Sequence, residues 1–473
     1  MTWPAPSPAE GASGTFPRER PCPGVARAHT PGVPPPSRDP AAPSSPPSDP
    51  RTPPSVDPAL TRFLLRTAEL LHAYGTPAHR LERLIVNLAA DAGQEVQVFS
   101  SPTSIFLGFD GEQTGSGVRL LRVQPGGVDL GRLMAMDEVL EQVEDGELDH
   151  AAALVRMEAL HAAPTRGGVA TSLIGHALAA GAAAIFFGGC LADALLSAAV
   201  GLVIGLLERV SSRKEGTTGT FEPFAAFLAA GVGLLGAHFL GGAVDDRVVA
   251  LASVIVLVPG LSLTVALVEL ATRNLASGTA RLAGAMTVFL TIAFGAYLGR
   301  LVVRTFVPLS GPFPAPEPEP WLSTPLALAV LLTVAATGFG LLFGARLREL
   351  PWILGSSAAG FMAARCTAWV ASNGHATDGA VQVSAAAAFA GALAVAAFSN
   401  AYARLKDRPA TVPLLPGLLV LVPGAIGYRA LSAFADQNAL DGVASVYEML
   451  LVGAALVGGT LTANVVVPPR RVL

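Results

Sequence analysis

The chain has 473 residues, of which 51% are hydrophobic, only 14% are charged and 50 are glycines. This composition, with a mean hydropathy of +0.52, is typical of a polytopic membrane protein. A net charge of −4 gives no reason to expect a nucleic-acid partner, and the three cysteines predict neither a disulfide framework nor a metal site.

Residues 1–56 are rich in Pro, Ala, Ser and Arg and contain almost no large aliphatic side chains. A segment of this composition cannot bury enough apolar surface to fold, so we expect a disordered tail. No charged n-region precedes an apolar h-region here, and we therefore expect no cleaved signal peptide.

The next segment, residues 57–168, shows helical and then strand periodicity and predicts a small soluble α+β domain. Its first two helices are separated by Gly75-Thr-Pro77, and its strands by Ser-Pro and Asp-Gly turns. The segment is expected to end with two more helices. The expected strands are 95–99, 104–109 and 118–123, and the expected final helices are 130–143 and 148–160.

From Val169 onward, apolar runs approach the roughly 20 residues that a bilayer-crossing helix needs. The expected spans, about ten, are 169–187, 190–207, 221–241, 248–268, 279–303, 324–344, 351–371, 379–399, 411–432 and 446–467. Lys and Arg gather in the loops on one side, which also holds both termini. By the positive-inside rule we expect the termini and the α+β domain to be cytoplasmic, and the Pro-rich linker 307–323 to be extracytoplasmic.

One sequence, Val-Leu-Val-Pro-Gly, occurs at 256–260 and again at 420–424, each time within an apolar run. Pro removes a backbone donor and clashes with the preceding turn, so each copy predicts an interrupted helix. Interruptions at corresponding places in two halves indicate a transporter's binding site. Aligning the copies pairs the first span with the sixth, which predicts two five-helix repeats of inverted topology, 169–306 and 324–473.

Polar groups beside the two interruptions are candidates for a substrate pathway. Ser262 and Thr264 follow the first Pro-Gly pair, and their hydroxyl groups either cap freed carbonyls or bind a substrate. Backbone N–H groups freed after each break suit a carboxylate, as helix N-termini do. Asn274 lies near a span end, where loop anchoring is the default interpretation. The residues of the breaks themselves that we place on the pathway are Pro259, Gly260, Pro423 and Gly424.

Ionisable residues within the spans cost free energy in lipid, so each is expected to have a functional or structural role. Glu269 ends the fourth span and is either a proton-coupling carboxylate or an interfacial anchor near Arg273. Asp193 opens the second span, where the helix macrodipole already favours a carboxylate. His176 lies within the first span and is either a histidine that titrates near neutral pH or a packed histidine on a small-residue interface. We keep Glu269, Asp193 and His176 as candidates for proton coupling.

Arg365 lies in the middle of the seventh span. Because arginine cannot lose its charge, its guanidinium must face a partner or water. It is either a clamp for a substrate carboxylate or the partner of an acid such as Asp193, Glu269 or Glu448.

A set of motifs runs along nearly the whole chain. The first half carries Leu70-Leu-His-Ala-Tyr-Gly-Thr-Pro-Ala-His-Arg-Leu-Glu82, Phe99-Ser-Ser-Pro-Thr-Ser-Ile105, Phe187-Gly-Gly189 with Asp193, and Leu257-Val-Pro-Gly260 through Glu269, Asn274, Ser277-Gly278 and Arg281. The second half carries Arg404 to Pro409, Pro416-Gly417, and Leu421-Val-Pro-Gly424 to Arg429. From about Leu60 to Arg470 the chain resembles the threonine/serine exporter family, with its N-terminal and C-terminal modules fused.

The resemblance implies a cell-membrane transporter, not an enzyme, that exports threonine, serine or similar small amino acids by using the proton motive force. Its partners would be the substrate, protons and the lipid bilayer, with no cofactor, and self-association into a homo-oligomer is left open. Arg281 and Arg429, which close two of the motif blocks, join the pathway candidates. Related split systems are associated with succinate export, so a dicarboxylate exporter is the alternative.

Two other classes of protein also fit parts of the sequence. A membrane-anchored hydrolase would use His72, His79, Glu82, Asp91 and Ser100 of the α+β domain, but that domain has no GxSxG, HExxH or P-loop motif. A channel with a cytoplasmic sensor domain would fit the apolar runs, but paired helix breaks favour a carrier. A flux that saturates and depends on the proton gradient would separate carrier from channel.

Overall fold

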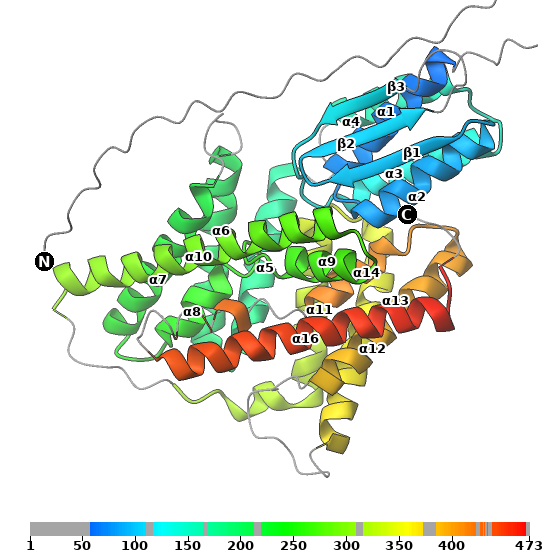
Figure 1. Ribbon diagram of the computed structural model, residues 1–473. Coiled ribbons are helices and arrows are strands. Elements are labelled where there is room, and N and C mark those ends of the chain that lie inside the picture. The colour runs from blue at the N-terminus through cyan, green and yellow to red at the C-terminus, as the bar shows by residue number, and fades with distance from the viewer. Residues whose placement is uncertain are drawn as a thin grey trace, which may run out of the picture. The chain divides into compact units, whose positions relative to one another are not determined.

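In the computed structural model of the protein, helices and one small sheet make up the described part of the chain (Figure 1). The structure describes residues 57–109, 117–163, 168–211, 219–308, 316–371, 385–421, 426–428, 430, 433 and 438–469. All of them belong to the compact unit Pro53–Leu473. The expected disordered tail, residues 1–56, lies outside the described residues.

The N-terminal α+β segment, defined as α1 to α4 with β1 to β3, has the element order that the sequence predicts. Three aspartates stabilise its helices, because Asp57, Asp129 and Asp149 each accept a hydrogen bond from a first-turn N–H. The helices are α1 (Pro58–Ala73), α2 (Ala78–Asp91), α3 (Leu130–Glu144) and α4 (His150–Ala162), and the strands are β1 (Val96–Ser101), β2 (Ser104–Phe109) and β3 (Gly117–Arg122).

The strands form an antiparallel sheet in the order β1-β2-β3, with Phe99 paired to Phe106 and Phe106 paired to Leu120. Side chains alternate between its faces. Ile105 and Leu107 are fully buried against the helices, whereas the Phe99–Phe106–Leu120 row is exposed. The sheet therefore contributes one face to the core.

Among the described residues, seven helices are long and apolar enough to cross a membrane, so the chain is a polytopic helical membrane protein. They are α5 (Gly168–Phe186), α6 (Leu191–Ser211), α7 (Phe221–Phe239), α10 (Leu275–Phe306), α11 (Pro325–Leu342), α13 (Ala385–Lys406) and α16 (Ala439–Val466). Helix α12 (Leu350–Ala371) has 22 residues but is not one of these seven. Two short 3-10 helices, η1 (Pro320–Ser323) and η2 (Leu347–Glu349), lie on either side of α11.

Two of the expected spans contain shorter helices. The fourth is divided into α8 (Asp246–Ser253) and α9 (Gly260–Ala271), which confirms the interruption predicted at Pro259. The ninth begins with α14 (Thr411–Leu419). The second predicted interruption, with Pro423, Gly424 and Arg429, lies outside the described residues and stays a prediction, as do the number of spans and their inverted repeat.

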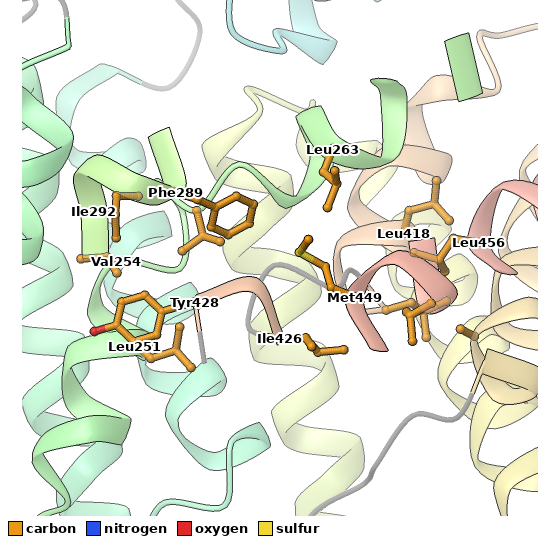
Figure 2. Packing of buried hydrophobic residues seen from close by; sticks show 14 of the residues in the cluster. Leu251, Val254, Leu263, Phe289, Ile292, Leu418, Ile426, Tyr428, Met449 and Leu456 are labelled. Atoms are coloured by element: carbon orange, nitrogen blue, oxygen red, sulfur yellow. The ribbon is translucent and has the colours of Figure 1, made fainter. Parts of the chain in front are cut away.

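The largest cluster of buried hydrophobic residues joins helices from both halves of the chain (Figure 2). Leu263 of α9 and Phe289 of α10 belong to the same cluster as Leu418 of α14 and Met449 of α16. A second cluster fills the α+β segment and also includes Leu415 of α14. The α+β segment is thus packed directly against the apolar helices.

Candidate functional site

The interruption of the fourth expected span is a set of hydrogen-bonded turns. Helix α8 ends at Ser253, α9 begins at Gly260, and between them the Val258 N–H donates to Val254 O at 3.1 Å and the Gly260 N–H to Val258 O at 2.8 Å. Pro259 has no N–H to donate and occupies the N-cap position of α9 with φ −78°. The chain therefore changes course here without a continuous helical ladder.

This interruption leaves polar groups without partners. The N–H groups of Leu261 and Ser262, in the first turn of α9, have no acceptor among the residues that the structure describes. Ser253 Oγ is buried and also has no partner there. The Thr264 hydroxyl, in contrast, donates to Gly260 O, four residues earlier in the same helix, at 3.0 Å. Free N–H groups at a helix start suit a ligand carboxylate, and a buried hydroxyl without a partner suits a ligand that can hydrogen-bond to it.

Glu269 lies at the other end of α9, and its side chain is fully buried. Its Oε2 accepts hydrogen bonds from Ser277 Oγ at 2.9 Å and Arg281 Nε at 3.1 Å. Its Oε1 accepts from the Ala78 N–H at 3.0 Å, at the start of α2, where the helix macrodipole favours an anion. The cationic partner of Glu269 is therefore Arg281 and not Arg273, which adopts φ 65° in the turn before α10.

Three segments far apart in sequence meet at Glu269. Besides the Ala78 contact, the Ser100 N–H donates to Glu82 Oε1 at 2.7 Å, and His72 Nε2 lies 3.0 Å from Pro102 O. These bonds bring together α1, α2 and β1, while Glu269 adds α9 and α10. We call this group of residues the junction: His72, Ala78, His79, Glu82, Ser100, Glu269, Ser277 and Arg281.

Burial determines the protonation of the junction residues in the α+β segment. It lowers the pKa of His72 and lowers that of His79 to about 3, so both imidazoles are neutral at pH 7. It raises the pKa of Glu82, although the Ser100 N–H acts in the opposite direction. Within the described ranges, no group of three or more His, Cys, Asp or Glu side chains is placed to bind a metal ion.

A second attachment joins the α+β segment to the other half of the chain. Glu138 of α3 accepts hydrogen bonds from Arg346 Nη1 and Arg408 Nη1, both at 2.7 Å. These guanidinium groups, Arg346 most strongly, lower the pKa of Glu138. Nearby, a Cβ added to Gly131 would lie 2.5 Å from the Gly344 carbonyl oxygen, so glycine is needed for this approach. No local pattern in the sequence predicts this attachment.

Two family models match the chain. One, described as a threonine/serine exporter, matches residues 62–302, which is about half of the chain. The other, described as Threonine/Serine exporter, ThrE, matches residues 328–466. The chain belongs to the threonine/serine exporter family. The resemblance expected from the motifs is confirmed, and three of those motif segments are the ones that meet at the junction.

Among curated proteins, this exporter-family chain is similar to Pheromone-regulated membrane protein 10 from several organisms. It is 25% identical to the Yarrowia lipolytica protein over 392 residues, which is 80% of this chain and 31% of the relative. It is 24% identical to the Eremothecium gossypii protein over 387 residues, which is 80% of this chain and 50% of the relative. The chain thus spans half or less of the length of these relatives. No solved structure is significantly similar to it.

Of the remaining predicted residues of this exporter-family chain, Asn274 lies next to the junction, where its N–H donates to Glu269 O at 2.8 Å. Asp193 is fully buried at the start of α6 and accepts hydrogen bonds from the Cys190 and Asp245 N–H groups at 2.8 and 2.7 Å. Asn274 is the N-cap residue of α10. Arg365 is exposed on α12, with its guanidinium carbon 5.8 Å from the centre of the Phe361 ring.

Proposed function

We propose that the chain is a secondary transporter that exports threonine, serine or similar small amino acids by alternating access, driven by the proton motive force. Membership of the exporter family supports the transporter class. The observation that carries the proposal is the interrupted helix, whose freed N–H groups and buried Ser253 hydroxyl lack partners in the described residues.

In this proposal the substrate carboxylate binds the N–H groups of Leu261 and Ser262, and the substrate hydroxyl bonds to Ser253. The Arg281 guanidinium is already bound to Glu269, and Arg365 is exposed on α12, so we assign the carboxylate to the backbone. Arg365 as a carboxylate clamp stays an untested prediction.

The proposed arrangement has two inverted five-helix repeats, residues 169–306 and 324–473, joined by an extracytoplasmic linker, 307–323. The α+β segment and both termini are cytoplasmic, and the chain lies in the cell membrane. The distribution of Lys and Arg supports this orientation. Pro423 and Gly424, with Arg429, supply the second interruption.

The proposal is for a transporter without enzymatic activity. A serine hydrolase needs a base within hydrogen-bond reach of its nucleophile. Ser100 Oγ has no partner among the described residues, and His72 Nε2 lies 3.0 Å from the Pro102 carbonyl instead. The junction therefore does not support the hydrolase alternative.

Uptake into everted membrane vesicles tests the proposal, because their exposed face is the cytoplasmic one. With an acidic lumen, labelled threonine, serine and succinate are offered in parallel. We expect saturable threonine or serine uptake that collapses with an uncoupler. Succinate uptake alone would change the substrate to a dicarboxylate, and no flux of any of the three from correctly inserted protein would contradict the transporter proposal.

A variant at the interruption tests the assigned binding site. Ser253→Ala removes one hydrogen bond to the substrate and should raise KM about tenfold, as the loss of about 1.4 kcal/mol predicts. The control is Ser323→Ala in η1, where the exposed hydroxyl donates to Pro320 O of its own turn. An equal KM in both variants would remove Ser253 from the substrate site.

A further inference from the structure

The three candidates for proton coupling are all buried, and they differ in the partners of their titratable atoms. Asp193 and Glu269 are both fully buried, and every carboxylate oxygen in the two groups accepts at least one hydrogen bond from protein. A proton carrier must exchange its proton with solvent on one side of the membrane. The bonding of these two carboxylates therefore favours a structural role, and the third candidate is His176.

His176 is 2% exposed in α5, and its two ring nitrogens have different neighbours. Nδ1 lies 2.9 Å from Ser172 O, a carbonyl that can only accept, so Nδ1 carries a hydrogen. Nε2 is then the atom that binds or releases a proton. It lies 3.1 Å from Glu208 Oε2 on α6, and the Glu208 side chain is 44% exposed.

The backbone of helix α6 lies close against this imidazole. A Cβ added to Gly205 would lie 2.9 Å from the His176 ring, and one added to Gly201 would lie 2.9 Å from the His176 carbonyl oxygen. A Cβ added to the preceding residue, Gly175, would lie 3.1 Å from the Gly338 carbonyl oxygen of α11. His176 thus lies where the first half of the chain packs closely against the second.

Other charged groups on the helices that pack against α5 and α6 are few. Helix α11 has no ionisable side chain, and α6 adds Asp193 and Arg209 to Glu208. Helix α8 carries Asp246, which is paired with Arg300 at 3.2 Å, and Arg247. Helix α7 carries Glu222 in its first turn and His238 in its last. Of these, Glu208 is the acid paired with the imidazole in the described structure.

We propose that His176 and Glu208 together form the proton-binding site of the transporter, which rests on the export function proposed above. A proton that enters from the acidic, extracytoplasmic side binds the Nε2 lone pair and gives an imidazolium beside the Glu208 carboxylate, and the half-exposed carboxylate then passes the proton to cytoplasmic water. Release returns the neutral imidazole and the anionic Glu208. No other group is oxidised, reduced or transferred in this step.

The test uses the full chain in proteoliposomes and compares two fluxes of threonine or serine. The first is accumulation driven by a pH gradient, which one coupled proton can raise about tenfold per pH unit. The second is exchange of labelled for unlabelled substrate without a gradient. We expect His176→Gln and Glu208→Gln to lose accumulation and to keep exchange within about twofold. The matched control, Glu222→Gln, changes an acid at the start of the neighbouring helix α7 and should keep both fluxes.

Each failure has its own signature. If the unmodified chain moves none of the offered substrates, the export function itself is wrong. If it accumulates substrate while both variants accumulate it equally with the same pH dependence, the proton-binding pair is wrong and the export function stands. Because Glu208 is half-exposed, Glu208→Gln is expected to fold even if His176→Gln does not, so it alone decides the outcome in that case.

Discussion

Glu269 gives the sharpest test of how the α+β segment is held. The substitution Glu269→Gln keeps the size of the side chain but removes its charge. It also places an amide NH2 against donors, because Ala78 N–H, Ser277 Oγ and Arg281 all direct hydrogens at the two oxygens. The variant therefore loses the ion pair and at least one hydrogen bond at a fully buried side chain.

The expected loss of unfolding free energy is large. Removing one partner of a buried ion pair typically costs about 3–5 kcal/mol. Arg281 is 21% exposed and regains some hydration, so we expect about 3 kcal/mol. The control is Glu158→Gln, since Glu158 is 56% exposed and pairs with Arg66 at 2.8 Å. Such a surface pair contributes less than about 1 kcal/mol.

The assay is denaturant unfolding of the detergent-solubilised full chain, completed by a double-mutant cycle with Arg281→Gln. A coupling energy of about 2 kcal/mol between Glu269 and Arg281 is expected. Equal losses for Glu269→Gln and Glu158→Gln would refute the reasoning about the junction. If Glu269→Gln instead has the unfolding free energy of the unmodified chain but abolishes substrate accumulation driven by a pH gradient, Glu269 is the proton carrier.

Three further outcomes follow from the same contacts. Pro259→Ala combined with Pro423→Ala should make the interrupted helices continuous and abolish flux while the protein still inserts into the membrane. Normal export by this variant would exclude the broken-helix site. The pKa of His79 lies near 3 in the folded chain, below its ordinary 6.5. The stability that the neutral His79 side chain gives the folded chain is therefore fully present above pH 6.5 and is lost as the pH falls towards 3. The unfolding free energy should therefore fall by about 1.4 kcal/mol per pH unit as the pH drops from 6.5 to 5, and His79→Gln should remove this dependence. An unchanged slope in the variant would mean that His79 titrates normally. Glu138→Gln should cost about 1–2 kcal/mol by releasing Arg346 and Arg408, and an unfolding free energy equal to that of Glu158→Gln would show that this attachment contributes little.

Local patterns in the sequence predicted most of the secondary structure. Within the described residues the apolar runs of membrane length contain helices, and the strands lie within a few residues of their predicted positions, because both depend on neighbours close in sequence. The interruption at Pro259 was predictable for the same reason, since a proline without an N–H acts on its own turn.

Contacts between distant segments could not be predicted in this way. Arg273 was the expected neighbour of Glu269, but the chain reverses there with φ 65° and brings Arg281 to the carboxylate instead. Glu208 was overlooked because it sits beside Arg209 at the end of a span, where charges usually face water. Only the packing of α5 on α6, which Gly201 and Gly205 permit, places it against His176.

The two attachments of the α+β segment bear on how an alternating-access cycle could proceed. Glu269 ties the segment to the first half of the chain and is fully buried, whereas Glu138 ties it to the second half and is 32% exposed. If the halves move relative to each other, the segment cannot keep both attachments unchanged. Exposed charges exchange partners with water at low cost, but a buried carboxylate does not. The α+β segment should therefore move with the first half. Glu138→Gln should mainly change the transport rate and have a smaller effect on the unfolding free energy. Glu269→Gln should mainly lower the unfolding free energy and have a smaller effect on the transport rate.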